Sequence, residues 1–370
     1  MHAIQLRSAV AQLFTVLALA CALPFTSYAA DPQLKIGSLV PKNSLYHRQL
    51  MEVGEAWKKS QSGSSRFNVF TDGSQGGEAE MVRRMRIGQL QAALLSVVGL
   101  REIEPSIAAL QNLPLAFRSW EELDYVREKM RPGMEKKFLD KGYVVLAWGD
   151  AGWVRFFSKQ AAFSPDDYKK MKFFAWGSEA EQQEIMKSMG YTPVPLEPTD
   201  ILPSIQTGMI NVVPSTPYFA LASQIYNSAP NMLEINWAPI VGAFVISKKS
   251  FDEMSPETQV VLRSSSDKAG SVIRMQARKE VEEAVDAMKK RGLQVNKPNA
   301  EQMKEWRALT ETLYPRIRGK MVPAETFDEV FAHLKTYRAS KTPWSKFFKA
   351  AAYCKIGMRA LPHSPFAGWF

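Results

Sequence analysis

The sequence predicts an α/β protein with two lobes that are braced by one long helix. Segments typical of strands and helices alternate over residues 34–150, and the same alternation begins again near residue 153. A third stretch, from Ser255 to Gly292, has the pattern of a single long helix. Alternation of this kind predicts helices layered on a mainly parallel sheet. With 370 residues, the chain is long enough for two domains of ordinary size.

The first thirty residues have the layout of a secretory signal. One cation, Arg7, precedes an apolar run, and small residues follow it up to Ala29 and Ala30. This order predicts a signal peptide over residues 1–30 that is cleaved near Ala29 or Ala30. An uncleaved membrane anchor is the alternative, because the apolar run approaches the length that spans a bilayer. Cleavage is favoured because no basic cluster follows the run, so we expect an exported, soluble mature protein.

The first series of elements occupies residues 34–150. Apolar or alternating segments predict strands at 34–40, 66–73, 91–97 and 143–150. Segments with a helical period predict helices at 46–60, 78–88 and 119–130. This part of the chain is therefore expected to form one α/β lobe.

The second series follows directly. It predicts strands at 153–158, 172–176, 192–196 and 210–215, and helices at 179–189, 198–208 and 217–227. No long linker rich in glycine, serine or proline separates the two series. We therefore expect continuous strands, and not a flexible tether, to join the two lobes.

The long helix has clear signals at both ends. Ser255 is suited to the N-cap and Pro256 to the first helical position. Gly292 follows a basic last turn that complements the helix dipole. An unbroken helix of this length would measure roughly 55 Å and would brace both lobes. The alternative is a kink at Gly270, or two separate helices.

Composition and charge limit the classes of function. Hydrophobic residues make up 46% of the chain and charged residues 23%, which is typical of a globular protein. The net charge of +10 is concentrated at the two ends, since Arg7 leaves with the signal and residues 341–370 hold five cations and no acid. The body of the protein has no basic stripe with interleaved aromatics, so nucleic acid is not an expected partner.

Cysteine and histidine patterns exclude further classes. Cys21 lies in the signal, so Cys354 is alone in the mature chain and no internal disulfide is expected. The histidines of the mature chain, His47, His333 and His363, lack the spacing of metal ligands. No Gly-x-Ser-x-Gly motif is present. We therefore expect no enzyme, no metal site and no cofactor.

Two closely joined α/β lobes in an exported protein suit a clamshell binding protein, which closes around a ligand in its cleft. Five stretches carry a more specific resemblance: "GSLVPKNSLYHRQLMEVGEAWKK", "VFTDGSQGGEAEMVRRMRIGQLQAALLS", "LQNLPLAFRSWEEL", "FSPDDYKKMKFFAW" and "LEPTDILPSIQTGMINVVPSTP". In this order they resemble the dicarboxylate-type solute-binding subunit of tripartite ATP-independent periplasmic (TRAP) transporters, the bacterial extracellular solute-binding protein family 7. The resemblance covers roughly residues 33–338.

The resemblance implies a periplasmic protein that delivers a small organic ligand to the membrane permease subunits of a TRAP transporter, without catalysis. It also implies two α/β lobes and a long bracing helix. We expect lobe I at residues 31–152 plus about 241–290, and lobe II at 153–240 plus about 291–340. A basic, aromatic C-terminal extension would occupy residues 341–370.

The chain departs from the family pattern where the ligand would bind. The family typically has an arginine for the ligand carboxylate on the strand after the turn "DYKKMK", and Phe174 stands there. An arginine makes bidentate, charge-assisted hydrogen bonds that phenylalanine cannot replace. Where the family often has an acidic–amide pair, around Pro214 and Ser215, only the hydroxyls of Ser215 and Thr216 are offered. Polar recognition is therefore expected to be weaker on this side.

The candidate binding residues lie at strand ends and beside the crossovers, where open α/β sheets bind ligands. Arg155 resembles the second arginine with which the family reaches its ligand, and a structural salt bridge to an acid such as Asp150 is the alternative. Phe174 and Trp176 are two residues apart on one strand, so their side chains lie on the same face of the sheet and are expected in the cleft. Phe173 lies on the opposite face and is expected in the core. For any one aromatic, a place in the core is the alternative. The predicted ligand-binding residues are Tyr46, Gln75, Ser96, Trp153, Arg155, Phe174, Trp176, Ser215, Thr216, Tyr218 and Trp237.

We therefore expect a ligand that is a monocarboxylate, or more apolar than a dicarboxylate, in an aromatic cleft between the lobes. The alternative function is a periplasmic carrier or adaptor that passes a hydrophobic compound to another envelope system through its basic tail. The tail, residues 341–370, predicts an amphipathic helix that either docks on the body or contacts the membrane surface. An enzyme on the same scaffold is the least supported hypothesis.

Overall fold

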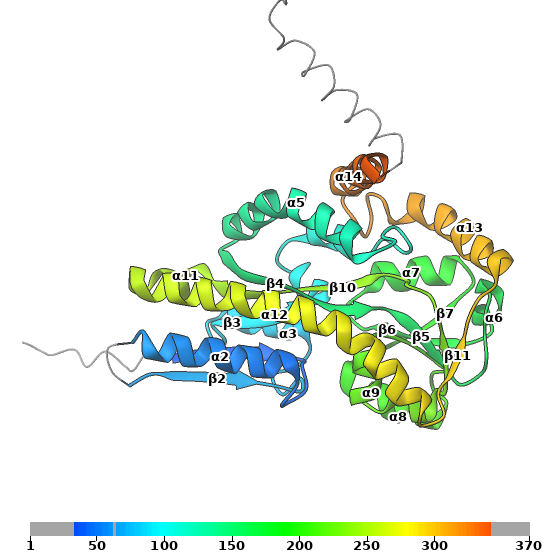
Figure 1. The fold of residues 1–370 in the computed structure, drawn as a ribbon, viewed down its shortest axis with the longest axis horizontal. Helices are drawn as coiled ribbons and strands as arrows, with labels where there is room; N and C mark the ends of the chain where they lie inside the picture. The colour runs from blue at the N-terminus through cyan, green and yellow to red at the C-terminus, as the bar shows by residue number, and fades with distance from the viewer. Residues whose placement is uncertain (1–32, 62–63, 342–370) are drawn as a thin grey trace, which may run out of the picture.

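Residues 33–61 and 64–341 are described by the structure, which is a computed structural model. They form two β-sheets, one in each lobe, with helices packed around them (Figure 1). The predicted α/β fold with two lobes is therefore confirmed. The predicted signal peptide and the extension at 342–370 lie outside the described residues.

The sheet of the first lobe has five strands in the order β2-β1-β3-β10-β4. These strands are β1 (Gln33–Ser38), β2 (Arg66–Phe70), β3 (Ala92–Ser96), β4 (Tyr143–Trp153) and β10 (Pro239–Ser247). The helices of this lobe are α2 (Leu45–Lys59), α3 (Glu78–Arg86), α4 (Val97–Leu100), η1 (Pro105–Leu110), α5 (Trp120–Asp140) and α11 (Lys248–Asp252). Helix α2 contacts β2, α3 contacts β3, and α5 contacts β4.

The sheet of the second lobe has six strands in the order β11-β9-β5-β8-β6-β7. They are β5 (Arg155–Ser158), β6 (Lys172–Trp176), β7 (Thr192–Leu196), β8 (Val212–Ser215), β9 (Asn231–Leu233) and β11 (Gln294–Asn296). The short helices of this lobe are α6 (Pro165–Lys169), α7 (Ala180–Ser188), η2 (Pro198–Asp200), α8 (Ile201–Thr207), α9 (Pro217–Ala222) and α10 (Ile225–Ser228). Strands β6 and β7 have the predicted bounds.

The two lobes are joined by strands that cross between them. Strand β4 leaves the first lobe and β10 returns to it, and they pair antiparallel from Pro239 opposite Trp153 to Ser247 opposite Tyr143. The lobes are thus connected by two paired strands, as the lack of a long linker in the sequence predicted. Because a departing and a returning strand run in opposite directions, the prediction of mainly parallel sheets is wrong for β10. Strand β5 is likewise antiparallel to both β8 and β9.

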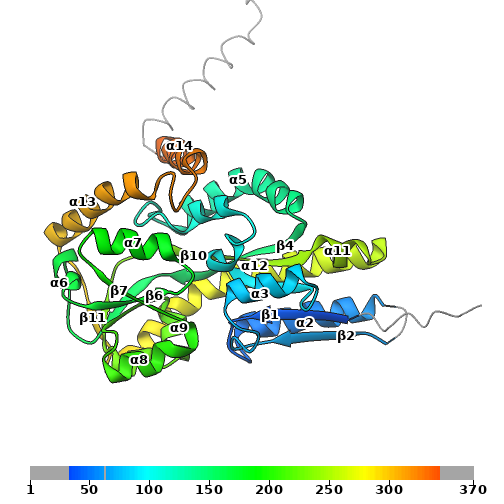
Figure 2. The same cartoon turned by 180° about the vertical axis from the view of Figure 1, so that it is seen from behind.

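Helix α12 (Pro256–Lys289) is one unbroken helix of 34 residues. It is about 51 Å long at ~1.5 Å per residue, and Ser255 caps it by accepting a hydrogen bond from the Thr258 amide. It packs on α2 and β4 of the first lobe and on α9 of the second. Figure 2 shows it running behind both sheets. Gly270 therefore permits a close approach to β4 and does not break the helix.

The C-terminal helices pack on different lobes. Helix α13 (Ala300–Ile317) contacts α6 and α7, as expected for a part of the second lobe. Helix α14 (Ala324–Lys341) contacts α5 and η1 of the first lobe instead. The described chain thus returns to the first lobe before residue 341, which differs from the assignment of residues 291–340 to lobe II. The guanidinium of Arg338 fixes this return by donating to the Glu122 carboxylate at 2.8 Å.

Candidate ligand-binding cleft

A cavity of about 380 Å³ lies between the two lobes. The carboxyl ends of β1, β3, β6 and β8 open onto it, at Ser38, Ser96, Trp176 and Ser215. This is the edge at which open α/β sheets place ligands. Apolar side chains from β4, β10, α12 and α13 line much of the rest of the cavity. The cavity therefore has the position of a ligand site and a largely apolar wall.

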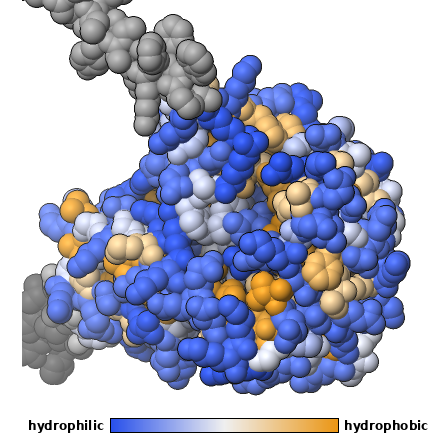
Figure 3. All heavy atoms as spheres, turned by 45° about the vertical axis from the view of Figure 1, so that its right-hand side comes forward, coloured by the Kyte–Doolittle hydropathy of each residue, from blue (hydrophilic) through white to orange (hydrophobic). Residues whose placement is uncertain are grey.

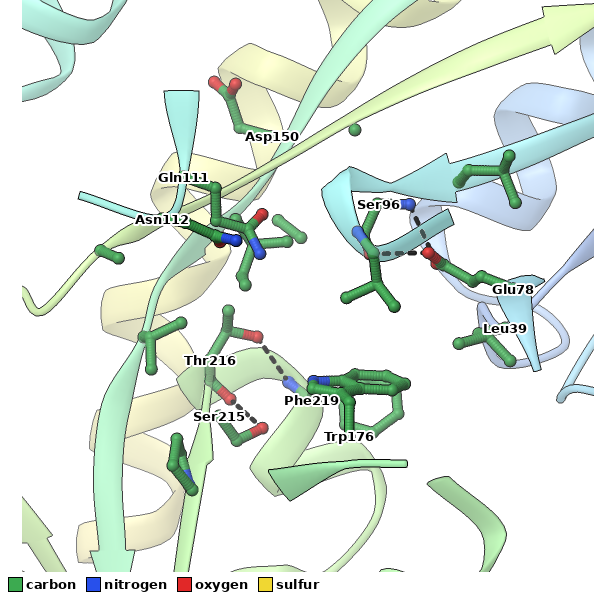
Figure 4. Close-up of a pocket in the computed structure, with 18 of the residues that line it drawn as sticks. Leu39, Glu78, Ser96, Gln111, Asn112, Asp150, Trp176, Ser215, Thr216 and Phe219 are labelled. Carbon is green, nitrogen blue, oxygen red and sulfur yellow. Dashed lines mark hydrogen bonds between the residues drawn. The ribbon is translucent and has the colours of Figure 1, made fainter. Parts of the chain in front are cut away.

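The first lobe contributes a hydrogen-bonded carboxylate, Glu78, at the start of α3 (Figure 4). Its Oε1 accepts a hydrogen bond from the Ser96 amide at 2.9 Å. Its Oε2 accepts from the Ser96 hydroxyl at 2.8 Å and from the Gly99 amide at 2.7 Å. Burial raises the pKa of Glu78, and these three donors oppose the rise. The turn between β3 and α4 is thereby fixed to α3.

Two amide side chains lie on the opposite wall. Gln111 and Asn112 follow η1, and both amides project toward the centre of the view in Figure 4. The Oε1 atom of Gln111 accepts a hydrogen bond from the Val241 amide of β10 at 3.1 Å. This bond orients the Gln111 side chain so that its nitrogen remains available to a ligand.

The second lobe contributes aromatic rings and hydroxyls. Phe174 and Trp176 on β6 have ring centroids 5.5 Å apart in an edge-to-face arrangement. Trp176 lies beside Phe219 of α9 in Figure 4. Thr216 caps α9, and its Oγ1 accepts a hydrogen bond from the Phe219 amide at 3.4 Å. The Thr216 hydroxyl thus already accepts a hydrogen bond from the helix that it caps, and the Ser215 hydroxyl donates to the Thr216 carbonyl at 3.4 Å.

Eight of the eleven predicted ligand-binding residues line the cavity. They are Tyr46, Ser96, Phe174, Trp176, Ser215, Thr216, Tyr218 and Trp237. Tyr46 of α2 and Tyr218 of α9 are in edge-to-face contact, with ring centroids 6.1 Å apart. Contact of these eight residues with a ligand stays a prediction. Phe173, expected in the core, is 3% exposed and packs against Phe156, and it also borders the cavity.

Arg155 does not line the cavity, and the expectation that it faces the cleft needs correction. Its Nη2 donates a hydrogen bond to the Glu282 carboxylate of α12 at 3.2 Å. Side chains alternate along a strand, and the neighbours Val154 and Phe156 are the ones that reach the cavity. Arg155 thus forms the structural salt bridge that was the alternative, although its partner is Glu282 and not Asp150.

Trp153 and Gln75 also lie outside the cavity lining. Trp153 stacks on Trp120 of α5 with ring centroids 4.6 Å apart, so it belongs to the core of the first lobe. The Oε1 atom of Gln75 accepts a hydrogen bond from Arg84 at 3.2 Å. In both cases a partner from the same lobe holds the side chain.

Several lining residues were not predicted from the sequence. Glu78, Gln111, Asn112 and Phe219 approach the cavity from helix ends and loops, for which no periodic pattern gives a direction. Glu78 closes the glycine-rich stretch "GSQGGE", which lacks the lysine and the spacing of a phosphate loop. A further apolar set comes from α7, α13 and the turn after α13. It consists of Ile185, Met186, Met189, Leu309, Leu313, Ile317 and Met321.

The charged groups on the cavity wall are all acidic. The described lining contains Glu78, Asp150 and Glu179, and it contains no lysine, arginine or histidine. Asp150 is paired with Arg127 at 2.8 Å and with Arg278 at 2.5 Å, and its carboxylate points away from the other side chains labelled in Figure 4. The cavity therefore offers no cationic side chain to an anion.

Glu179 joins the two lobes at the edge of the cleft. Its carboxylate accepts a hydrogen bond from the guanidinium of Arg101, which follows α4 in the first lobe. Arg101 also reaches Glu181 at 3.2 Å. Burial raises the pKa of Glu179, and the nearby positive charge of Arg101 opposes this. These contacts connect the two lobes at the edge of the cleft.

Among the described residues, no group of three or more histidine, cysteine or acidic side chains is placed to hold a metal ion. No helix in the described ranges is both long and apolar enough to cross a membrane. On the face shown in Figure 3, hydrophilic residues cover most of the surface and hydrophobic ones form small groups.

The family of the chain follows from its sequence. Residues 36–320 match the family described as bacterial extracellular solute-binding protein, family 7. The chain belongs to this family. The family consists of solute-binding proteins of transport systems, so this member is a binding protein and not an enzyme. The resemblance to TRAP solute-binding subunits that the five sequence stretches carry is thereby confirmed.

Two curated family relatives cover most of the chain. The 2,3-diketo-L-gulonate-binding periplasmic protein of Escherichia coli is 24% identical over 279 residues, which are 73% of this chain and 82% of that protein. The C4-dicarboxylate-binding periplasmic protein of Rhodobacter capsulatus is 20% identical over 317 residues, or 85% of this chain and 95% of that one. Both relatives thus match the chain over more than four fifths of their length.

Solved structures share the fold at lower sequence identity. A TRAP periplasmic solute-binding protein from Shewanella oneidensis with bound succinate has a TM-score of 0.76 at 15% identity. The match covers 82% of this chain and all of that one. A second, from Sulfitobacter with bound β-D-galacturonate, has a TM-score of 0.73 at 18% identity and covers 80% and 98%. The two-lobed fold of the family-7 member described here is therefore that of TRAP binding proteins.

Proposed function

We propose that this family-7 protein is the periplasmic solute-binding component of a TRAP transporter and that its ligand is a small organic molecule without a carboxylate. The ligand would be more apolar than a dicarboxylate and would lie in the cavity between the lobes. Membrane permease subunits of the same transporter would receive it from the closed protein. The supporting observation is the absence of any cationic side chain from the described cavity wall.

Burial of a carboxylate explains why this observation bears on the ligand. An ionised carboxylate loses its hydration in a closed cleft, and this costs several kcal/mol unless a charge or several hydrogen bonds replace the water. Phe174 stands where the family resemblance places an arginine, and it is 5% exposed and packed on Trp176. A carboxylate beside Phe174 would therefore remain uncompensated.

The monocarboxylate version of the expectation depended on Arg155. Since Arg155 pairs with Glu282 and Val154 lines the cavity in its place, no guanidinium supports such a ligand. Structural neighbours bind succinate and β-D-galacturonate, both of which carry carboxylates. The proposal therefore places this protein apart from those neighbours in ligand class, within the same fold and the same kind of transport.

The cavity wall favours an apolar or aromatic body. Phe174, Trp176 and Phe219 form one aromatic wall, and Trp237 lies on another part of the lining beside Phe156. Aromatic side chains bind flat or aliphatic groups by burial and by edge-to-face contact. The side-chain amides of Gln111 and Asn112 would then orient the ligand through a small number of hydrogen bonds.

The alternative of a periplasmic carrier that works through its basic tail concerns residues 341–370. All but the first of these lie outside the described residues, so no observation in the structure favours that alternative. The contact of the tail with a membrane surface likewise stays a prediction from the sequence.

The test is to identify the molecule that accompanies the protein. The mature protein is purified from its native host without detergent, unfolded, and the released small molecules are identified by mass spectrometry. The identified compound is then added back to ligand-free protein, and its binding is measured by isothermal titration calorimetry. A neutral, cationic or aromatic compound that rebinds supports the proposal. A dicarboxylate or hydroxy acid that rebinds stoichiometrically contradicts it.

A further inference from the structure

Glu78 is a buried carboxylate that borders the cavity and has no cationic partner among the described residues. It is 5% exposed, and its three hydrogen-bond donors are the amides of Ser96 and Gly99 and the hydroxyl of Ser96. None of these donors carries a charge. The two other acids of the lining have arginine partners, since Asp150 pairs with Arg127 and Arg278 and Glu179 with Arg101. Glu78 is therefore the one acid of the described lining without a charged partner. Its burial raises its pKa, and a cation bound beside it would lower that pKa again.

One oxygen of Glu78 has capacity for a further donor. A carboxylate oxygen can accept two hydrogen bonds. Oε2 accepts two, from the Ser96 hydroxyl and the Gly99 amide, whereas Oε1 accepts one, from the Ser96 amide. A ligand that donates to Oε1 would complete the set without displacing any existing bond.

The rigid surroundings of Glu78 suit a binding role. Ser96 caps α4, and its hydroxyl both accepts from the Val98 amide at 3.2 Å and donates to Glu78. A Cβ atom at Gly99 would lie 2.8 Å from the Glu78 Cβ, so the turn and the side chain are in close contact. The carboxylate is thus held in one position before any ligand arrives, which reduces the entropic cost of binding.

An aromatic ring lies on the facing wall of the same part of the cavity. Trp176 of β6 is half-buried, and in Figure 4 its indole lies below and to the left of Glu78, beside the ring of Phe219, with Leu39 nearer to Glu78. The faces of aromatic rings carry negative potential and attract cations, tryptophan most strongly. A buried carboxylate and a tryptophan ring that line one cavity are the two groups that proteins combine to bind an organic cation.

We propose that the ligand carries an ammonium group and that this group binds between the Glu78 carboxylate and the Trp176 ring. The ligand class is an organic amine, protonated at neutral pH, on an apolar or aromatic body. This inference rests on the proposed function, because it adds a positive group to a ligand that lacks a carboxylate. Glu78 is then the residue that determines specificity for charge.

The charge on Glu78 distinguishes three kinds of ligand. A carboxylate would be repelled by Glu78 and would find no cation on the described wall. A hydroxyl could donate to Oε1 but brings no positive charge to favour the ionised form of this buried carboxyl. An ammonium group donates to Oε1 and also neutralises the charge, so it gains the most from this wall.

The test uses three probes with one common body: 3-phenylpropylamine, 3-phenylpropan-1-ol and 3-phenylpropanoate. The mature protein is stripped of any bound molecule by unfolding and refolding, and each probe is titrated by calorimetry at pH 7. We expect the amine to bind at least about tenfold more tightly than the alcohol, from the ion pair and the aromatic contact together. The carboxylate should bind most weakly.

Variants assign this preference to the proposed site. Glu78→Gln removes the charge and should bring the amine down to the affinity of the alcohol. The glutamine side chain has one acceptor oxygen for the three donors from Ser96 and Gly99, so the folding of this variant is checked by circular dichroism and thermal melting. Trp176→Leu, which leaves the hydrogen bonds of Glu78 intact, should also reduce the preference for the amine. Glu184→Gln is the control, since this exposed acid of α7 changes the net charge equally but does not line the cavity.

The outcomes separate this inference from the proposed function. Equal affinity for amine and alcohol, or no binding of any probe, overturns the ammonium inference and leaves a neutral ligand as the proposal. The tightest binding by the carboxylate overturns both. A preference for the amine that Glu184→Gln reduces as much as Glu78→Gln does would show general attraction by surface charge, and this too overturns the assignment to Glu78.

Discussion

Gly270 of α12 lies directly against the Trp148 carbonyl of β4. A Cβ atom at Gly270 would be 2.7 Å from that oxygen and 2.9 Å from the Ala147 Cβ. The Arg274 guanidinium, one turn further along α12, donates to the same carbonyl at 2.6 Å. The bracing helix can therefore approach β4 closely because position 270 has no side chain. This contact fixes the first lobe to the element that also touches the second.

Replacement of Gly270 by alanine should destabilise the protein despite the higher helix propensity of alanine. The added methyl group must displace backbone and Ala147, and overpacking of this kind costs about 1–3 kcal/mol. The matched control is Gly133→Ala in α5, where a Cβ meets nothing within 4 Å. That change should stabilise the protein by about 0.5–1 kcal/mol. Urea unfolding of both variants measures the difference, and equal effects would contradict the close-contact argument.

The fold could be predicted largely from local patterns. Strands β6 and β7 and the start of α12 agree with their predicted positions, because apolar strands, Ser255 and Pro256 are local signals. The antiparallel course of β10 was not predicted. Its direction follows from the return of the chain to the first lobe, and no short stretch of sequence encodes a crossing between lobes. For the same reason, the contact of α14 with α5 could not be predicted.

The site was predicted in part, and the errors have a geometric cause. Phe174 and Trp176, which strand parity placed toward the cleft, line the cavity, but so does Phe173, which parity placed in the core. The expectation for Arg155 came from the family resemblance, whereas the alternation of side chains directs its neighbours Val154 and Phe156 toward the cavity. Glu78 was missed because it reaches the cavity from a helix start, where its direction depends on the distant turn at Ser96.

Arg101 and Glu179 should stabilise the closed form of the cleft. Glu179 is 3% exposed, and removal of Arg101 would leave its carboxylate buried without a partner, at a cost of about 3–5 kcal/mol in the closed form. Arg101→Met should therefore weaken ligand binding by at least about tenfold and should increase the dissociation rate. Stopped-flow fluorescence of bound and free protein measures both quantities.

The control for this closure is Lys136→Met. Lys136 forms an ion pair with Asp140 on α5, with both side chains exposed, and such pairs contribute little. Small-angle X-ray scattering adds a second readout, because Arg101→Met should increase the radius of gyration of the ligand-bound protein. Unchanged dissociation together with unchanged scattering would show that the pair does not control closure.

Arg278 should be important for stability more than for ligand affinity. It donates to Asp150 at 2.5 Å and to Asp124 at 2.7 Å, and it lies over the Trp120 ring at 4.6 Å. Arg278→Met should lower the free energy of unfolding by about 1–3 kcal/mol, with Arg127 still pairing the buried Asp150. Lys279→Met, at an exposed neighbouring position, is the control and should change stability by less than about 0.5 kcal/mol. Equal losses in the two variants would contradict a role for the buried network.

The Glu122–Arg338 pair should make the attachment of α14 dependent on pH. Burial acts to raise the pKa of Glu122, but hydrogen bonds from Arg338 and from the Arg118 amide lower it below its usual value. A carboxyl whose pKa is lower in the folded state adds stability above its unfolded pKa of about 4.3. That stability is lost as the pH falls through the folded value.

Thermal melts of the wild type and Glu122→Gln between pH 7 and pH 3 measure this contribution. The variant should melt at a lower temperature at pH 7, because Arg338 loses its charged partner. Below about pH 4 the difference should shrink, because the wild-type carboxyl becomes protonated and the pair is lost there as well. Glu325→Gln, an exposed acid in the first turn of α14, serves as the control and should give a nearly constant difference. A Glu122→Gln difference that stays constant down to pH 3 would mean that Glu122 contributes through packing and not through its charge.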